Sequence, residues 1–493
     1  HFCWPLQANP RMLAILLISL LASGVHSDAS AEESDMARFV SLPKYHEKLE
    51  ELEGKMLAKL DSTNDDERQQ LLSERLEEIA AAGFAPTAFD GEFEEINEHS
   101  QLSADFYEGD IILSQEQLEA LDVVDPRNIS FRARRQAWKP QRFPSNIWGT
   151  TPIPYSFDPS YPADGIPVIR EAIKFWQDNT CIRFQEGGAG TQRVKFIHGN
   201  GCYSYIGRLN QEQPVSIGNG CKWIGTVTHE LGHTLGLYHT QSRLDRDRFV
   251  VVNKNNIQQG QAHNFDMGPQ GELDNFEIPY EYGSNMHYHP YGFARDNKVP
   301  TLVAVDKKYQ YSMDGRVPTF YDILLINKYY GCFDAMCKGV SVSCQNGGVQ
   351  DVKNCRSCKC PPGYAGSDCS QIDPKFKKIA ATAGNRKEET VSVGDSKKWE
   401  MAPKAYEGFY VLEAPAGKRL ELIVTKTDVK VVAPNCHYGG MQIWTSKDTR
   451  MSGVKFCSKE QLEPYYISEG ERIFIYVWSL YADVNISFTQ RYY

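Results

Sequence analysis

The chain of 493 residues is too long for one hydrophobic core, and this length predicts two to four domains. Its formal net charge of −10 arises mainly in residues 28–135, which contain 27 acidic and 11 basic residues. The rest of the chain is weakly basic. Because nucleic-acid binding requires a concentrated positive patch, we expect no nucleic-acid partner.

An apolar run from Met12 to Val25 follows Arg11 and leads into small and polar residues. This pattern predicts a signal peptide over residues 12–27, and we expect residues 1–11 to be upstream sequence outside the protein proper. A membrane anchor is the alternative, but about 14 apolar residues fall short of the roughly 20 that span a bilayer. We therefore expect a secreted, extracellular protein with no membrane span.

The chain contains thirteen cysteines, and Cys3 lies before the predicted signal peptide. The other twelve are an even number, which agrees with disulfide formation in an oxidising compartment. Six of them crowd into residues 337–369 with several glycines, and so short a segment needs disulfides to hold a fold. Cys355 and Cys358 form a C-x-x-C pair, so a metal site is the alternative for this module.

Helical spacing of apolar residues predicts an exposed amphipathic helix within residues 36–82, which Gly83 follows. The acidic segment then ends in the basic run from Arg132 to Arg135. A dense basic run on a flexible connection is typical of sites that precursor-processing proteases cut, so we expect cleavage after Arg135. A solvated charge cluster is the alternative.

The remaining sequence is typical of folded domains. Strands are predicted at residues 154–157 and 204–208, and a proline in the first turn suits a helix over residues 168–177. Apolar residues alternate over residues 420–424 and 473–477. Alternation between turn signals predicts an all-β domain beyond residue 370.

The strongest signal is H-E-x-x-H-x-x-G-x-x-H over residues 229–239. On a helix, His229 and His233 lie one turn apart on the same face, so both imidazoles can bind one metal ion. His239 can join them if the helix ends at Gly236, because glycine adopts left-handed backbone angles without steric cost. The pattern predicts a site for one Zn²⁺ ion per chain.

This motif also predicts a reaction. Zinc on three neutral imidazoles keeps a position open for water, lowers the pKa of that water towards about 7 and polarises a substrate carbonyl. Glu230 lies beside the ligands and is expected to take the proton as general base. The alternative, that these are ordinary core or surface histidines, does not account for five specified positions in eleven residues.

A second element is centred on Met286, in the run from Tyr282 to Tyr288. A methionine after the third ligand is typical of the metzincin pattern, in which a tight turn places the thioether beneath the metal site. Taken alone, Met286 would be an ordinary core residue. With the long motif, it is predicted to support the metal site.

Several of these runs together resemble the astacin family of zinc endopeptidases. They are the stretch from Cys221 to Asp247, the Tyr-x-Ser-x-Met-His-Tyr form of the turn at residues 282–288, and the Asn-Thr-Cys-Ile-Arg-Phe run at residues 179–184. The order of segments is similar to that of nematode astacins with an EGF-like module and a CUB domain behind the protease.

The resemblance implies an α+β fold. A two-lobed metzincin-type protease domain with a helix-borne zinc site would precede a small disulfide-rich EGF-like module and an all-β CUB-like sandwich. The implied boundaries are residues 28–135 for the propeptide, 136–333 for the protease, 334–370 for the EGF-like module and 371–493 for the CUB-like domain.

The resemblance also implies roles for single residues. Tyr288 would be a fifth zinc ligand in the resting enzyme and would swing away to stabilise the oxyanion, a role that an O–H donor suits. Residues 106–111 are similar to the F-x-G-D latency motif, so Asp110 would take the place of the catalytic water on zinc in the proenzyme. The implied disulfides are Cys181–Cys332, Cys202–Cys221, Cys337–Cys355, Cys344–Cys358, Cys360–Cys369 and Cys436–Cys457.

Three features depart from the family pattern. Thr240 stands where many astacins have a glutamate that anchors the new amino terminus, which leaves the anchoring of this terminus open. The CUB-like region lacks one usual cysteine pair and has Gly439 and Gly440 where calcium-binding forms carry acidic residues. The EGF-like module also lacks the acidic cluster of calcium-binding versions, and we expect no calcium in either.

Asn128 and Asn485 begin N-x-S sequons and are expected glycosylation sites of a secreted chain. The sequence as a whole predicts a zinc metalloendopeptidase, made as a zymogen, that cuts extracellular matrix or cuticle proteins. Protein partners are expected at the EGF-like and CUB-like domains. The alternatives are a non-catalytic adhesion protein that binds through those domains and a non-proteolytic zinc hydrolase.

Overall fold

The computed structural model describes residues 42–62, 66–83, 93–100, 103, 106–120, 136–138, 144–149, 152–267, 273–398, 401–461 and 465–493. The predicted signal peptide, Cys3, the cleavage site after Arg135 and the sequon at Asn128 lie outside these residues. Within the described ranges, the helices are all too short or too polar to cross a membrane.

The acidic segment is largely helical where the structure describes it. Its elements are α3 (Leu42–Ser62), α4 (Asp66–Ala82), α5 (Phe93–His99), β1 (Ile111–Ile112) and α6 (Gln115–Ala120). The predicted helical spacing is confirmed, although it forms two helices, α3 and α4, in place of one. Most side chains of α4 are exposed, as expected of an amphipathic surface helix, and Leu72 on its apolar face is buried against Val251 and Val303.

A six-stranded sheet with strand order β1-β6-β7-β5-β3-β4 forms one part of the region predicted to be a protease, residues 136–333, which we call the protease region. Its other strands are β3 (Ile153–Phe157), β4 (Phe184–Glu186), β5 (Arg193–Ile197), β6 (Cys202–Tyr205) and β7 (Glu212–Ile217). At one edge, β1 of the acidic segment runs parallel to β6, with Ile111 opposite Ser204. The strand predicted at residues 204–208 ends early, because Gly207 has a φ of 68° and turns the chain out of the sheet.

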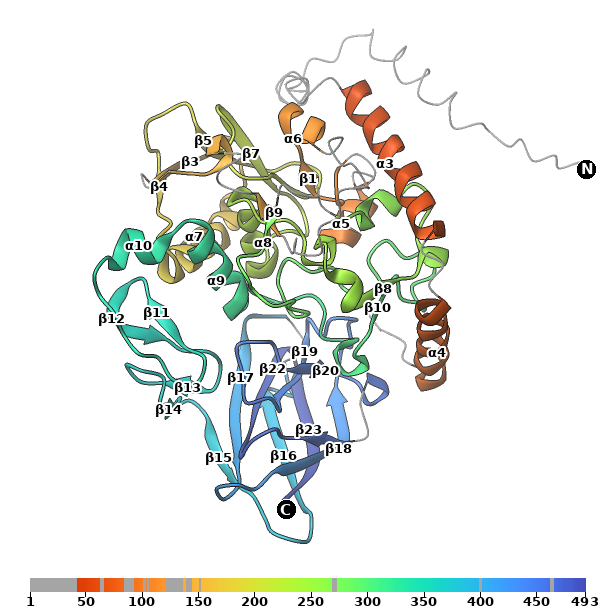
Figure 1. Cartoon of the computed structure of the whole chain (residues 1–493), viewed down its shortest axis with the longest axis vertical. Helices are drawn as coiled ribbons and strands as arrows, with labels where there is room; N and C mark the ends of the chain where they lie inside the picture. Colours follow the sequence, from red (N-terminus) through yellow and green to blue (C-terminus); the bar gives the residue numbers. More distant parts are fainter. Residues whose placement is uncertain are drawn as a thin grey trace, which may run out of the picture. The chain divides into compact units, whose positions relative to one another are not determined.

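Two helices pack beside this sheet (Figure 1), namely α7 (Ile166–Asn179) and α8 (Ile224–Thr234). The predicted helix over residues 168–177 is confirmed within α7. Trp176 of α7 is fully buried, and its indole N–H donates to the carbonyl oxygen of Thr228 at 3.1 Å. This contact fixes α8, which carries the zinc motif, against α7.

The second part of the protease region has little regular structure beyond α8. Short strand pairs join β2 (Ala137–Trp138) to β9 (Leu273–Asp274) and β8 (Val250–Val252) to β10 (Leu302–Ala304). The helix α9 (Phe320–Tyr329) then leads to α10 (Cys332–Cys337). A capping box begins α9, because the Thr319 hydroxyl accepts from the Asp322 N–H and the Asp322 carboxylate accepts from the Thr319 N–H.

The cysteine-rich segment is held by disulfides around two short hairpins. The hairpin strands are β11 (Val349–Asp351), β12 (Asn354–Lys359), β13 (Tyr364–Ala365) and β14 (Gln371–Ile372). Within the part of the chain that the structure describes, six disulfides join Cys181 to Cys332, Cys202 to Cys221, Cys337 to Cys355, Cys344 to Cys358, Cys360 to Cys369 and Cys436 to Cys457. Cys355 and Cys358 belong to different disulfides, so the alternative of a metal site at this C-x-x-C pair is wrong.

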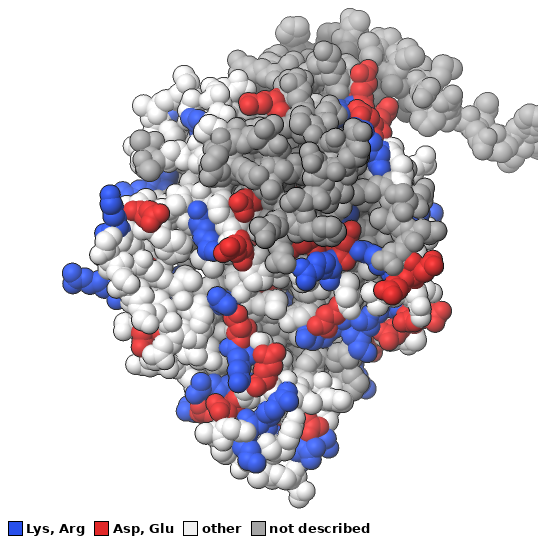
Figure 2. All heavy atoms as spheres, in the orientation of Figure 1, with Lys and Arg blue, Asp and Glu red and all other residues white. Residues whose placement is uncertain are grey.

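The C-terminal β domain consists of two sheets with a shared apolar core. Its strands are β15 (Lys377–Ala380), β16 (Lys387–Gly394), β17 (Met401–Glu413), β18 (Leu420–Val429), β19 (Gly439–Trp444), β20 (Val454–Phe456), β21 (Tyr466–Ile467), β22 (Arg472–Tyr481) and β23 (Asp483–Tyr492). The strands that alternation predicted at residues 420–424 and 473–477 are confirmed as parts of β18 and β22. On the face drawn in Figure 2, acidic and basic side chains are interspersed.

Polar contacts join this β domain to the protease region. Glu281 is buried, and its carboxylate accepts from the Ser452 N–H at 3.0 Å. The ammonium of Lys455 donates to the Asp314 carbonyl oxygen at 2.6 Å, and the Asn435 amide donates to the Asp314 carboxylate at 2.7 Å. Buried polar atoms at this boundary therefore depend on partners from the other domain.

Because of Glu281, we expect the stability of this boundary to depend on pH. Burial raises the pKa of Glu281 from 4.5 to about 8, so between these pH values the folded state holds a proton that the unfolded state has lost. Its contribution to stability therefore falls as the pH rises through this window. We expect Glu281→Gln, which keeps an acceptor oxygen but cannot ionise, to lose this part of the pH dependence in urea unfolding at pH 5 and pH 8.5.

The exposed Glu388 provides the matched control. Glu388→Gln should leave the difference between the two pH values as it is in the unaltered protein. Equal pH dependence in the Glu281→Gln and Glu388→Gln proteins would contradict the prediction.

Candidate metal centre

Three histidines converge at the end of α8. His229 and His233 lie one turn apart within the helix, which ends at Thr234. Gly236 has a φ of 101° and turns the chain back, so that His239 meets the other two. The Nε2 atoms of His233 and His239 lie 2.9 Å and 3.2 Å from that of His229, and all three side chains are buried.

A carboxylate of the acidic segment completes this cluster. One oxygen of Asp110 lies 3.0 Å, 3.3 Å and 3.4 Å from the Nε2 atoms of His229, His233 and His239. Burial opposes the charge of this carboxylate, but the imidazoles of His239 and His233 outweigh it and hold the pKa of Asp110 well below its usual range. The four residues are a set of three nitrogens and one oxygen that fits tetrahedral zinc.

Hydrogen bonds from Nδ1 orient the rings of His229 and His233. In the tautomer that leaves Nε2 free for a metal, the Nδ1–H of His229 donates to the Asn285 carbonyl oxygen at 2.6 Å. The Nδ1–H of His233 likewise donates to the Leu237 carbonyl oxygen at 2.7 Å. Such contacts fix the ring orientation of a metal ligand.

Glu230 is a second indication that this cluster is a metal site, and it also indicates proton transfer there. Its side chain is fully buried, and within the described residues neither carboxylate oxygen has a hydrogen-bond partner. Burial, with the negative charge of Asp110, raises the pKa of Glu230 well above its usual range. A buried, unpartnered carboxylate beside three ligands is poised to exchange protons with a group that enters the cluster.

Tyr288 packs against the third histidine. It is fully buried, and its ring centroid is 4.7 Å from that of His239. The hydroxyl donates to the carbonyl oxygen of Glu108 at 2.6 Å. In this state the phenol predicted as a zinc ligand therefore binds the main chain of the acidic segment.

Met286 packs directly under the zinc helix. It is buried, and a Cβ placed on Gly232, between the two histidines of α8, would lie 2.7 Å from its sulfur. The turn around Met286 is held by Asp322 of α9, whose carboxylate accepts from the Ser284 hydroxyl at 2.6 Å and the Asn285 N–H at 3.1 Å. Sequence reasoning missed Asp322, although the Thr-x-x-Asp capping pattern is visible in the sequence.

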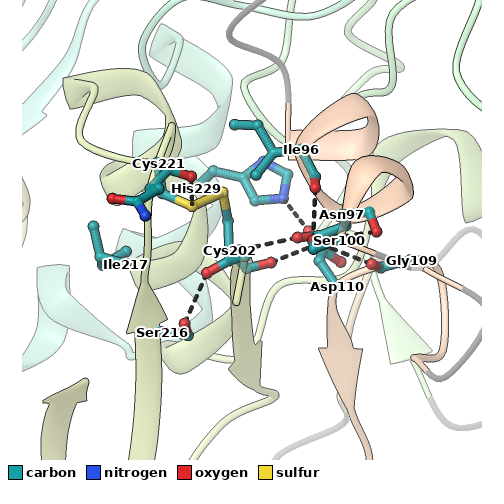
Figure 3. The surroundings of a disulfide bond; sticks show 12 residues. Ile96, Asn97, Ser100, Gly109, Asp110, Cys202, Ser216, Ile217, Cys221 and His229 are labelled. Atoms are coloured by element: carbon teal, nitrogen blue, oxygen red, sulfur yellow. Dashed lines mark hydrogen bonds and ion pairs between the residues drawn. A yellow bond between two sulfur atoms is a disulfide. The ribbon is translucent and has the colours of Figure 1, made fainter. Parts of the chain in front are cut away.

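Further residues of the acidic segment cover the cluster. The ring of Phe93 stacks on His239 at 5.5 Å between centroids and lies 4.5 Å from His229. Asn97 of the same helix, α5, is fully buried. Its amide donates to the carbonyl oxygens of Gly109 at 3.0 Å and Cys202 at 2.7 Å (Figure 3). Asn97 thus joins the turn before Asp110 to β6, a role that the sequence analysis did not identify.

Thr240 has a partner at the start of the protease region. The Gln136 amide donates to the Thr240 hydroxyl at 2.9 Å, and the Tyr238 N–H donates to the Gln136 carbonyl oxygen at 3.0 Å. Gln136 is only 3% exposed. The residue after the predicted cleavage site is therefore already packed beside the third histidine.

Removal of the Asp322 carboxylate should loosen the turn beneath the metal site. Asp322→Ala leaves the buried Ser284 hydroxyl and Asn285 N–H without their acceptor, so we expect the free energy of unfolding to fall by about 1–3 kcal/mol. Asp322→Asn keeps one acceptor oxygen and should lose less. Urea unfolding of the zinc-loaded protein measures the effect, with the exposed Asp334→Ala as control. Equal free energies of unfolding for Asp322→Ala and Asp334→Ala would contradict this prediction.

Comparison with known proteins agrees with this geometry. The family model described as Astacin (Peptidase family M12A) matches residues 141–331. The zinc metalloproteinase nas-31 of Caenorhabditis elegans is 32% identical over 394 residues, which are 79% of this chain and 64% of that protein. For nas-29 and nas-28 of the same organism, identities are 33% and 32%, over 72% and 76% of this chain and 67% and 76% of the relatives.

The chain thus spans 64% of the length of nas-31, and a larger share of the other two relatives. The matched family region contains the three histidines, Glu230 and the turn at Met286. With its metal-ligating cluster and these relatives, the chain belongs to the astacin family of peptidases.

Proposed function

We propose that this protein is a zinc-dependent endopeptidase that is made as an inactive precursor. The observation that carries the proposal is the buried Glu230 carboxylate, without a hydrogen-bond partner in the described residues, beside three converging imidazoles. The family of the chain and the printed names of its relatives, zinc metalloproteinases, support the same activity.

Each residue of the site has a part in peptide hydrolysis. His229, His233 and His239 would hold the zinc ion, which when bound would polarise the substrate carbonyl and lower the pKa of water. Glu230 takes a proton from the attacking water and returns it to the leaving amine, a role that its position next to His229 in the chain allows. Tyr288 donates a hydrogen bond from its hydroxyl to the developing oxyanion once that hydroxyl leaves the Glu108 carbonyl oxygen.

The precursor is inactive because residues of the acidic segment occupy the cluster of three histidines. Asp110 lies where substrate and water would enter, and Phe93 covers two of the histidines. Cleavage after Arg135 would separate this segment from the protease domain and leave Gln136 beside Thr240. We propose this pairing as the anchor of the new amino terminus.

We also propose that the protein is secreted, and we propose its domain boundaries, its substrates and a glycosylation site. Six disulfides support secretion into an oxidising compartment. We propose a protease domain over residues 136–333, an EGF-like module over 334–370 and a CUB-like domain over 371–493, acting on extracellular matrix or cuticle proteins. Asn485, half-buried on β23, is the proposed glycosylation site.

The general-base role of Glu230 can be tested by an isosteric change. Glu230→Gln keeps the size of the side chain but cannot take the proton, so we expect kcat to fall by about 10²–10⁴-fold. Peptide hydrolysis by the propeptide-free protein measures this, with zinc content determined in parallel. Glu171→Gln, at an exposed position of α7, should keep full activity.

Near-unaltered hydrolysis by Glu230→Gln would rule out this mechanism. The adhesion alternative predicts no hydrolysis by the unaltered protein, and a non-proteolytic zinc hydrolase predicts chelator-sensitive activity on other substrates only. Hydrolysis that a chelator abolishes and zinc restores therefore separates the three functions.

Latency should depend on the backbone at Gly109. Its φ of 76° costs a residue with a side chain about 1–2 kcal/mol, and its Cβ would lie 2.5 Å from the Phe293 ring. Gly109→Ala should therefore weaken the docking of Asp110 and give the uncleaved chain measurable hydrolysis of a short peptide.

Gly83 provides a matched control, because its φ is 70° but nothing lies within 4 Å of its Cβ position. Gly83→Ala should leave the uncleaved chain as inactive as the unaltered precursor. Equal inactivity of both variants would show that the turn at Gly109 does not maintain latency.

A further inference from the structure

The three imidazoles of the metal site differ in the hydrogen-bond partner of Nδ1, the ring nitrogen that faces away from the metal. His229 and His233 donate to the main-chain carbonyls of Asn285 and Leu237, which belong to the protease region itself. His239 has a different kind of partner, because its Nδ1 lies 2.7 Å from a carboxylate oxygen of Glu108. That carboxylate belongs to the acidic segment before Arg135.

The local backbone directs two carboxylates to one place. Glu108 and Gly109 both have positive φ values, 49° and 76°, so the chain turns sharply between Glu108 and Asp110. A non-glycine residue in this conformation is uncommon and costs free energy. The contacts of Glu108 offset this cost, since its carbonyl oxygen accepts from Tyr288 at 2.6 Å while its side chain binds His239.

The Glu108 contact is buried and therefore strong. Neither Glu108 nor His239 is exposed to solvent. A carboxylate that accepts from an imidazole N–H orients the ring and raises the basicity of its other nitrogen, which is the one that binds the metal. A main-chain carbonyl, as at His229 and His233, orients the ring without a full negative charge.

We propose that Glu108 is a positioning residue for the third metal ligand, so that the precursor holds zinc more tightly than the mature enzyme does. Asp110 acts on the metal side of the cluster, and Glu108 acts behind His239. Removal of the propeptide then takes away both carboxylates. Zinc is accordingly loaded into the precursor, where all three imidazoles are oriented. This inference rests on the proposed zinc site and on release of the propeptide.

Zinc retention by the uncleaved full-length chain tests the proposal without any substrate. The measured quantity is the rate at which a coloured chelator in excess removes zinc. We expect Glu108→Ala to release zinc about 10–100-fold faster than the unaltered precursor, the range typical of lost outer-shell partners. Glu108→Gln should lie between the two, because its amide oxygen still accepts from Nδ1–H. The control is Glu116→Gln, at an exposed position of α6, which should match the unaltered chain.

A second measurement separates positioning from a loosened propeptide. The imidazole Nδ1 proton of His239 should give a strongly downfield NMR signal in the zinc-loaded precursor, because a buried carboxylate accepts it. This signal should shift in Glu108→Gln, whose side chain keeps its size, and stay in Glu116→Gln. Once the propeptide has been cut and removed, proteins made from all the variants should release zinc alike, and faster than the unaltered precursor.

The outcomes distinguish this inference from the proposed function. If the propeptide-free protein binds zinc and cuts peptides but Glu108→Ala retains zinc as the Glu116→Gln control does, only the role of Glu108 is overturned. The same holds if the mature protein retains zinc as tightly as the precursor. If the unaltered chain binds no zinc at all, both the proposed function and this inference are wrong.

Discussion

The convergence of three imidazole nitrogens within about 3 Å, in an interior closed to solvent, is the constraint on which the protease region depends. Nitrogen lone pairs at this separation repel one another unless a cation lies between them. For His239 to reach the other two imidazoles, the helix α8 must end after His233 and the chain must reverse at Gly236. Among the other polar groups at the centre, the Nδ1 atoms of the three histidines and the Tyr288 hydroxyl have buried partners, whereas the Glu230 carboxylate has none within the described residues.

The parts of this arrangement that could be predicted from sequence are local. Helical spacing brings His229 and His233 together, and a glycine at position 236 allows the reversal that adds His239. The alternation in β18 and β22 is also local, since each strand shows its own period. Family resemblance added Asp110 and Tyr288, which spacing alone does not identify.

The parts that could not be predicted join distant residues. Asn97 reaches Cys202, and Asp322 reaches Ser284, across separations of 105 and 38 residues. No periodic pattern encodes such a pairing, because it depends on how elements pack. The same holds for Lys455 and Asp314, which meet at the boundary between the protease region and the β domain. Glu108 stands within a recognised motif, but its role requires the position of His239.

The packing of Gln136 has a consequence for the timing of activation. This residue is buried beside Thr240 while Phe93 and Asp110 still fill the cluster. Under the proposed cleavage after Arg135, these contacts would already be in place before the chain is cut, and the cut itself would remove no contact from the metal centre. A cut molecule would then stay inactive until the severed segment dissociates, so that the onset of activity would depend on dilution as well as on the cut.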